Sequence, residues 1–168
     1  MALGKDYAGQ NCSIARALEV VGERWTLLII RDAFFGVRRF SDFLAHLDCP
    51  RAVLSGRLQT LVESGVLTKR LGEYTLTESG RELWPIVYML GQWGGRHFSA
   101  DGPTRVLVHA ECGTPIDPAG DCPPCGVPGV PPTDLEVHTV PGRDLRDDPV
   151  ARALRSPHRL LEPLPVRP

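Results

Sequence analysis

The chain has 168 residues, of which 42% are hydrophobic and 23% charged, and its formal net charge is −1. These values exclude a wholly disordered chain, and they leave no overall basic field, so a nucleic-acid partner would have to be met by a local patch. No apolar run approaches the ~20 residues of a membrane span, and residues 1–6 carry no apolar signal core. We therefore expect one domain, or one domain with a small module, in the cytoplasm.

Composition changes near residue 99. Of the 16 prolines, 14 follow that point, and the net charge falls from +2 before it to −3 after it. Proline favours turns and loops over packed helices. We expect a folded domain over residues 1–99, a small loop-rich module over residues 104–142, and a flexible tail over residues 143–168 with at most a short helix at 150–154.

The first elements expected in chain order are two helices. Ser13 can cap a helix whose apolar side chains recur at helical spacing, and Gly22 ends that helix. Residues 25–35 are apolar nearly all round, which predicts a central, buried helix that stops at Gly36.

Two short helices joined by a turn follow, which is the signature of a helix-turn-helix. Ser41 can cap the first helix, and Pro50 suits the first position of the second, which ends at Gly65. Residues 38–70 carry a net charge of +3 and offer donors suited to phosphates and base edges. A solvated helix face with incidental arginines is the alternative. The candidate DNA-binding residues are Arg39, Ser41, Arg51, Ser55, Arg57, Gln59, Thr60, Lys69 and Arg70.

A hairpin and a last helix complete the front domain. Residues 67–71 and 74–76 predict two short strands around Gly72, and Thr77 can cap a long helix that runs to about Phe98. The apolar surface of that helix is wider than one small domain covers, which suggests a partner, with a larger internal core as the alternative. Its apolar residues are Leu83, Trp84, Ile86, Val87, Tyr88 and Leu90.

Several motifs follow one another in a fixed order through the front domain. They are residues 11–32, which begin Asn-Cys-Ser-Ile-Ala-Arg and include Trp25, the run Arg39-Phe-Ser-Asp-Phe-Leu, residues 50–67, the run Tyr74-Thr-Leu-Thr-Glu-Ser-Gly, and the run Leu90-Gly-Gln-Trp-Gly. Together they resemble the HxlR-type winged-helix transcription regulators over roughly residues 11–98. Agreement of several motifs in order makes this resemblance more specific than any one motif alone.

The resemblance implies a mainly α fold with a small β-hairpin, a winged helix-turn-helix related to the MarR group, which binds DNA as a homodimer. Each subunit would place residues 50–64 in a major groove, and two-fold symmetry predicts a pseudo-palindromic operator with half-sites about one helical turn apart. Only residues 71–73 separate the strands of the wing, which is shorter than is usual in the family. Lys69 and Arg70 are therefore kept as phosphate contacts only.

The rear segment carries a metal-ligand pattern, H-x2-C-x9-C-x2-C, formed by His109, Cys112, Cys122 and Cys125. Each pair resembles a zinc-ribbon knuckle, and residues 105–108 can form the strand that leads into the first one. Four such ligands suit a tetrahedral zinc ion and leave no open position for catalysis. Because the segment has few large apolar residues, it needs a metal to fold. We expect about one structural zinc per chain.

Other uses of these residues remain open. Cys122-Pro-Pro-Cys125 has the C-x-x-C spacing of a thiol oxidoreductase, but the Gly-Val-Pro-Gly that follows cannot form the helix such a motif needs. A regulatory disulfide is the second alternative. His138 is a substitute ligand with less regular spacing.

Two signals are conceivable. Cys12 lies at the start of the first helix, where a thiol pKa is lowered, and its position resembles that of a cysteine with which some family members sense oxidants. The alternative is a small packed residue, as we expect for Cys49. A small aromatic effector could lie between the dimer helices near Trp84, Tyr88 and Trp93, although these aromatics could equally be core.

No catalytic constellation is present, so we expect a regulator and not an enzyme. Its partners would be double-stranded operator DNA and a second copy of itself, without a membrane. The alternative is a protein-interaction module that uses the zinc ribbon, with DNA binding weakened by the short wing. Steep salt dependence of duplex binding would favour the regulator.

Overall fold

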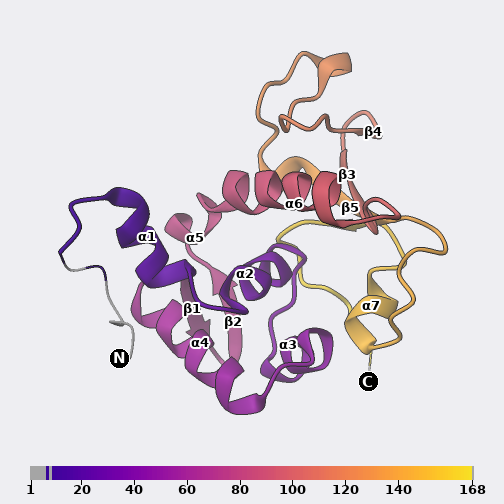
Figure 1. The fold of residues 1–168 in the computed structure, drawn as a ribbon. Coiled ribbons are helices and arrows are strands. Elements are labelled where there is room, and N and C mark those ends of the chain that lie inside the picture. Colours follow the sequence, from indigo (N-terminus) through magenta and orange to yellow (C-terminus); the bar gives the residue numbers. More distant parts are fainter. Residues whose placement is uncertain (1–6, 8, 168) are drawn as a thin grey trace.

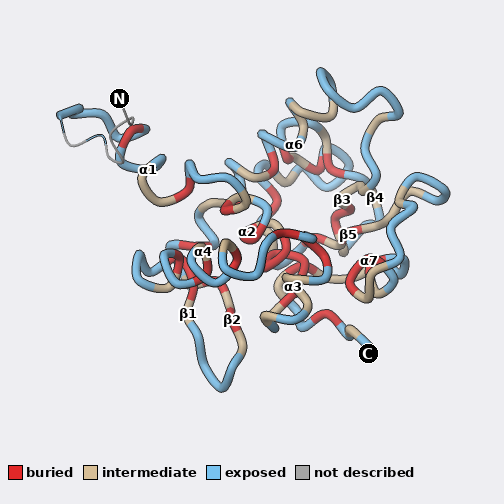
Figure 2. Tube along the Cα trace, turned by 60° about the horizontal axis from the view of Figure 1, so that its bottom comes forward, coloured by how far each residue is buried: buried red, intermediate tan, exposed pale blue. Residues whose placement is uncertain are grey.

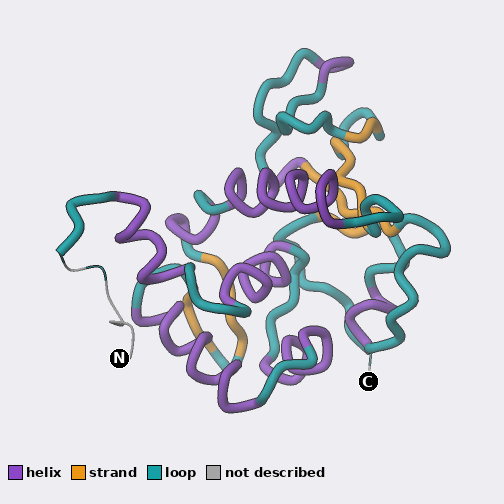
Figure 3. The backbone as a smooth tube through the Cα atoms, viewed as in Figure 1, coloured by secondary structure: helices purple, strands orange, loops and turns teal. Residues whose placement is uncertain are grey.

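The computed structural model describes residue 7 and residues 9–167, and it has a helical body joined to a small antiparallel sheet (Figures 1 and 3). The helices are α1 (Ser13–Val21), α2 (Thr26–Phe34), α3 (Phe40–Leu47), α4 (Arg51–Glu63), α5 (Glu78–Arg81), α6 (Trp84–Phe98) and α7 (Pro149–Ala153). The strands are β1 (Leu67–Arg70), β2 (Glu73–Leu76), β3 (Arg105–His109), β4 (Thr114–Pro115), β5 (Leu135–Thr139) and β6 (His158–Arg159), and η1 (Pro123–Cys125) and η2 (Pro132–Asp134) are 3-10 turns. None of the described helices is long and apolar enough to cross a membrane.

Helix α2 lies at the centre of the helical body. Ile29, Ile30 and Phe34 are fully buried, as the nearly continuous apolar run predicts, and α2 contacts α3, α6 and β2. In Figure 2 the buried residues gather along α2 and the facing sides of α3 and α4, whereas most of α1 is exposed. The central, buried second helix is therefore as the sequence predicts.

Three predicted helix starts are displaced by one or two residues. Cys12 occupies the N-cap of α1 where Ser13 was expected. Ser41 lies in the first turn of α3, and Arg39 takes the N-cap position without a side-chain cap. Pro50 occupies the N-cap of α4 instead of its first helical position. These shifts leave the inward and outward faces of the helices unchanged.

The hairpin of β1 and β2 forms the wing. The strands pair antiparallel up to Arg70 and Glu73, so that two residues join them. Leu71 and Gly72 have φ values of 50° and 83°, the two positive values that a type I′ turn requires. The side chain of Leu71 is fully exposed at the tip. The wing is thus as short as the sequence indicates.

The single long helix predicted from Thr77 to Phe98 is two helices, α5 and α6. Thr77 caps the first, because its Oγ1 accepts a hydrogen bond from the Gly80 N–H at 3.1 Å. Pro85 then has no N–H to continue the ladder, and its ring clashes with the preceding turn. A second helix therefore begins with Pro85 in its first turn.

The second half of the chain is built on a sheet with the strand order β4-β3-β5-β6, in which all neighbours are antiparallel. Strand β3 is central and pairs along its whole length with β5, Arg105 opposite Thr139 and His109 opposite Leu135. The sheet lies beside α6 in Figure 1, and loops make up most of its connections (Figure 3). The strand expected at residues 105–108 is therefore present.

Residues 143–167 are not the flexible tail that the sequence predicts. Helix α7 packs on α3, β6 extends the sheet, and Val150, Leu154 and Leu160 are buried. Gly36, with a φ of 86°, accepts a backbone hydrogen bond from this segment, and a Cβ there would collide with its backbone. The prediction of a flexible tail from composition is wrong because a few apolar residues, spaced between prolines and arginines, are enough to anchor the segment to an existing core.

A buried polar network joins this C-terminal segment to α3. His46 is 1% exposed, and its Nδ1 lies 3.0 Å from Asp148 Oδ1, while its Nε2 lies 3.8 Å from Asp32 Oδ1. Asp148 also caps α7 through the N–H groups of its first turn. Arg146 donates to the His46 carbonyl and lies 3.2 Å from Asp148. One carboxylate thus fixes both the start of α7 and the ring of His46.

We expect the free energy of unfolding to fall as the pH is lowered from 7 to 5, in part because of His46. Burial lowers the pKa of His46 from 6.5, an effect opposed by Asp32 and Asp148 and increased by Arg31. The unfolded chain takes up a proton near pH 6.5 that the folded chain resists, so stability present above that pH is lost below it, by at most ~1.4 kcal/mol per pH unit. Urea unfolding of the wild type and of His46→Asn checks this, because Asn retains a donor for Asp148 but does not titrate. Equal declines in both proteins would contradict the assignment.

Candidate nucleic-acid interface and metal centre

Helix α4 has one buried face and one exposed face. Leu54, Leu58 and Leu61 recur at helical spacing and are at most 1% exposed, and they anchor α4 to the helical body. The opposite face exposes Ser55 and Gln59. A recognition helix needs this arrangement, in which an anchored helix presents polar side chains to a groove.

Six of the candidate DNA-binding residues are exposed on α4 and on the wing, and four of them have no side-chain hydrogen bond within the described part of the chain. Arg51 and Ser55 are exposed on α4, and the Arg51 guanidinium lies 4.9 Å from the centroid of the Phe40 ring. Stacking on an aromatic ring restricts the rotamers of an arginine while its donors stay accessible. Lys69 and Arg70 are exposed on β1. These four side chains present donors to solvent.

Three other candidates on α4 are bonded within the chain. Arg57 Nη2 donates to Glu23 Oε2 at 2.7 Å, Gln59 Nε2 donates to Glu63 Oε1 at 2.8 Å, and Thr60 Oγ1 donates to a backbone carbonyl at 3.1 Å. Each would have to exchange its present partner for a base or a phosphate. The charge count along the sequence could not show this, because Glu23 is 34 residues away from Arg57.

The remaining two candidates lie at the base of the wing. Arg39 is exposed, with its Nε 3.7 Å from Glu73 Oε1, and Arg38 lies 3.9 Å from the same carboxylate. Ser41 donates to Asp42 at 3.1 Å. Glu73 therefore offsets part of the positive charge that the sequence assigned to this surface.

The predicted metal ligands come together in one cluster. His109, Cys112, Cys122 and Cys125 each offer a ligand atom, and these atoms all lie within 4.8 Å of one another. Cys112 Sγ lies 3.5 Å from His109 Nδ1 and 3.5 Å from Cys122 Sγ. A zinc ion with Zn–S bonds of ≈ 2.3 Å has sulfur–sulfur edges of about 3.8 Å in a tetrahedron. The spacing therefore fits a tetrahedral ion, whereas a disulfide would need about 2 Å.

Two tight turns position the four ligands. Gly113 and Gly126, with φ values of 69° and 65°, follow the second ligand of each pair. The Gly113 N–H donates to the His109 carbonyl at 2.8 Å, and the Gly126 N–H donates to the Pro123 carbonyl at 3.1 Å. His109 ends β3, so the sheet fixes the first pair. In the second pair, Cys122 precedes η1 and Cys125 is its last residue, and an antiparallel bridge between residues 122 and 127 closes this turn.

Hydrogen bonding sets the protonation of the thiols. Side-chain and backbone hydrogen bonds from Thr114 lower the pKa of Cys112 to about 6, which favours the thiolate that binds metals. Hydrogen bonding to Cys112 and Cys122 raises the pKa of Cys125 to about 12. A divalent metal bound to the cluster would favour the thiolate form of its sulfur ligands.

The other histidine and thiols lie outside this cluster. His138, on β5, has its Nε2 3.1 Å from Glu136 Oε2 and is not brought to the cluster. Cys12 is exposed, whereas Cys49 is buried, and burial raises the pKa of its thiol. Cys12 is therefore the more accessible of the two to an oxidant.

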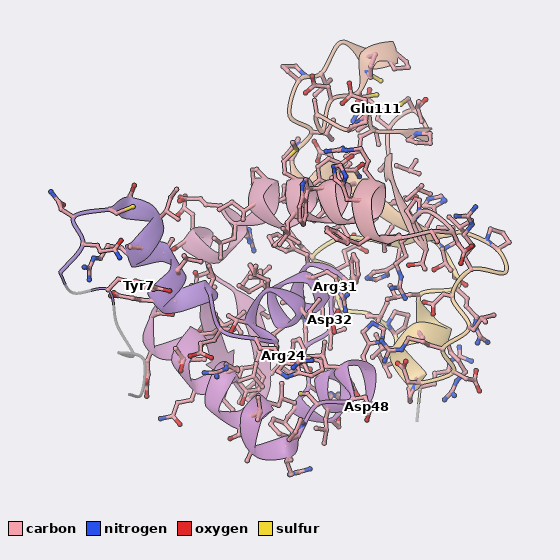
Figure 4. The ribbon with its side chains drawn as sticks, viewed as in Figure 1. Tyr7, Arg24, Arg31, Asp32, Asp48 and Glu111 are labelled. Atoms are coloured by element: carbon pink, nitrogen blue, oxygen red, sulfur yellow. The ribbon has the colours of Figure 1, made fainter. Side chains whose placement is uncertain are left out.

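Of the three aromatic residues of α6 that the sequence singled out, Trp84 and Tyr88 line one cavity and Trp93 does not. Trp84 and Tyr88 are buried and stack with ring centroids 5.9 Å apart, whereas Trp93 is 49% exposed and packs against Phe98. On the inner side, α2 contributes Arg31, which lies beside Asp32 in Figure 4. Sequence reasoning named Trp84 and Tyr88 but missed Arg31, because residues from distant segments that follow no motif complete the lining.

Comparison with known proteins gives consistent matches. A family model described as HxlR-like helix-turn-helix matches residues 20–101. The uncharacterized HTH-type transcriptional regulator Rv3095 of Mycobacterium tuberculosis (strain ATCC 25618 / H37Rv) is 47% identical over 122 residues, which cover 68% of this chain and 77% of Rv3095. YybR of Bacillus subtilis (strain 168), which bears the same description, is 30% identical over 51% of this chain and 74% of its own length. The crystal structure of PA1607 aligns with a TM-score of 0.60 and 36% identity over 70% of this chain and 88% of PA1607.

Proposed function

The chain belongs to the HxlR-like helix-turn-helix family of transcription regulators, and on that premise we propose that it binds operator DNA as a homodimer. Each subunit places residues 50–64 in a major groove, with the two half-sites about one helical turn apart. The observation that carries the proposal is the exposed face of α4, where Arg51 and Ser55 lie opposite a buried leucine stripe. Lys69 and Arg70 on the wing contact phosphates.

Selection of duplexes from a random pool, followed by titration at several salt concentrations, tests the proposal. We expect a pseudo-palindromic consensus and a log affinity that falls linearly with log salt, by about 0.9 for each phosphate contact. Absence of duplex binding at low salt, or binding without sequence preference, would contradict it. That result would favour the alternative, in which the module of residues 104–142 binds another protein.

The dimer is supported by uncovered apolar side chains on two helices. Helix α1 contacts the core through other residues, whereas Ile14 and Leu18 face away from it and are exposed. Helix α6 exposes a stripe on the side opposite to its buried aromatic residues. Patches of this kind on soluble proteins mark association surfaces. The residues of the α6 stripe are Ile86, Met89, Leu90 and Trp93.

Leu90→Arg should convert the dimer into monomers and weaken operator binding by roughly tenfold or more, because a charge would be desolvated in an apolar interface and a monomer holds only one half-site. Sedimentation velocity at micromolar concentration and the operator titration measure the two effects. Leu145→Arg is the matched control, since Leu145 is 86% exposed on a loop outside the helical body. A Leu90→Arg variant that remains dimeric would remove α6 from the interface.

We also propose that the cluster of His109, Cys112, Cys122 and Cys125 binds a structural zinc ion. A closed set of four ligands holds the module of residues 104–142, while residues 1–99 bind DNA and dimerise. The support is the convergence of the four ligand atoms from two separate turns.

The proposal includes a response to thiol oxidation at Cys12. This thiol is exposed and immediately precedes α1, whose residues Ile14 and Leu18 belong to the proposed dimer surface. A polar or charged oxidation product there would lie beside that apolar surface. Oxidation would then act on DNA binding through the dimer.

A further inference from the structure

A cavity of about 630 Å³ lies between the helical body and the C-terminal sheet. One wall is α6 and the end of α2, and the other is β3 with the segments that flank it, including Pro103, Ile116 and Pro118. The volume falls within the ≈ 300–1,000 Å³ range of sites for small molecules. In Figure 1 this is the region where α6 passes beside β3 and β5. Two distant parts of the chain therefore form the cavity together.

Three glycines on α6 form an open stretch of the cavity lining, the glycine wall, beside larger side chains such as Tyr88 and Phe98. Gly91, Gly94 and Gly95 all line the cavity, and a Cβ built on any of them would meet nothing within 4 Å. Each glycine in a helix interior costs about 0.5–1 kcal/mol relative to alanine. No neighbouring atom is close enough to exclude a side chain at these positions. The effect of the glycines is therefore to leave space in the cavity. Val87 and Trp84 add apolar surface beside them.

Two arginines line the opposite end of the cavity. The guanidinium groups of Arg31 and Arg105 lie 5.8 Å and 5.5 Å from the centroid of the same ring, that of Phe35. Arg31 donates twice to Asp32 Oδ1, and Arg105 Nη2 donates to Asp144 at 2.7 Å. The Nε of Arg105 is buried and has no hydrogen-bond partner. An unmet buried donor is costly, and an acceptor supplied by a ligand would remove that cost.

Each arginine of the cavity wall is paired with one carboxylate behind it, Asp32 or Asp144. Among the lining residues there are two arginines and no Asp or Glu, since both acidic partners lie outside the lining. Burial lowers the pKa of Arg105, and Arg31 adds to this while Asp144 opposes it. A ligand anion would therefore bind through the donors that these two ion pairs leave free, which include the buried Nε of Arg105.

We propose that this cavity binds a small aromatic carboxylate, with the ring against the glycine wall of α6 and the carboxylate on Arg31 and Arg105. A flat ring fits a wall without side chains, and a carboxylate matches the planar fork of an arginine. That such a ligand modulates operator binding rests on the proposed function. Binding itself does not, because the cavity lies apart from α4 and the wing.

Isothermal titration of the full-length protein with 2-naphthoate and with the neutral 2-naphthamide tests the site without DNA. We expect 2-naphthoate to bind. The affinity for 2-naphthamide should be lower by roughly tenfold or more, because the amide lacks the charge. Gly94→Leu should abolish binding by filling the cavity, and the Arg96→Ala variant, altered on the same helix outside the lining, should bind as the wild type does. Leucine is a better helix former than glycine, so thermal unfolding should show the Gly94→Leu variant still folded.

No binding of 2-naphthoate at millimolar concentration, equal binding of the amide, or unchanged binding by Gly94→Leu would overturn the assignment. An operator titration with and without 2-naphthoate is a separate measurement. Failure of the chain to bind any duplex would remove the proposed function and leave the ligand site standing. Normal operator binding without naphthoate binding would remove the ligand site and leave the proposed function standing.

Discussion

Replacing Cys122 with Ser should leave the purified chain with far less than one zinc ion and unfold the C-terminal sheet. Cys122 is fully buried, and its Sγ lies 3.5 Å from that of Cys112. A serine hydroxyl is a poor ligand for zinc because it remains protonated at neutral pH. Structural zinc sites contribute an apparent 10–16 kcal/mol in small peptides. Loss of one ligand in four is therefore the largest single-residue effect that we expect in this half of the chain.

The unfolding should spread beyond the two turns. His109 ends β3, which is hydrogen-bonded to both β4 and β5. When the ion is lost, the first turn is no longer fixed to the second, and the central strand loses its anchor. Hydrogen exchange should then show reduced protection of β3 and β5, with protection of α2 and α4 retained.

Elemental analysis of protein purified under reducing conditions, without added metal, is the measurement. Cys125→Ser should lose zinc as well, although Cys125 is exposed, which separates metal loss from loss of core packing. Cys12→Ser is the control and should keep about one zinc ion per chain, since its thiol lies outside the cluster. A wild type that holds no zinc, or a Cys122→Ser variant that holds as much, would refute the site.

The convergence of His109, Cys112, Cys122 and Cys125 could be predicted because the pattern is local. Two pairs separated by two residues each define a turn, and a chain that brings both turns together forms the cluster whatever surrounds it. The helix-turn-helix could be predicted for the same reason, from its leucine spacing and its turn residues. The folding of residues 143–167 could not, because it depends on single side chains such as Val150 and Leu160 that insert into a core built by other segments.

The two arginines of the cavity and the polar network were beyond sequence reasoning on the same grounds. His46 and Asp148 are 102 residues apart and meet only because α7 packs on α3. Arg31 and Arg105 lie in different halves of the chain and share the ring of Phe35. Periodicity and spacing report on neighbours along the chain, whereas these contacts arise from the final packing.

Arg51→Ala should weaken operator binding by ~1–3 kcal/mol for each half-site that the residue contacts, and Arg57→Ala should weaken it by less. The sequence alone made these arginines equivalent. In the structure Arg51 is exposed, stacked on Phe40 and free to present its donors, whereas the guanidinium of Arg57 is bonded to Glu23. Arg57 can reach DNA only by giving up that bond, so the two variants should separate.

Fluorescence anisotropy with the selected operator, at two salt concentrations, measures the difference and assigns the contact. If Arg51 contacts a base, Arg51→Ala should relax sequence preference at one position of each half-site, and the salt slope should change little. A phosphate contact would instead weaken binding to all sequences and reduce the salt slope by about one. Full affinity in Arg51→Ala, or a greater loss in Arg57→Ala, would show that α4 meets DNA on a different face, because the exposed arginine would then not lie in the groove.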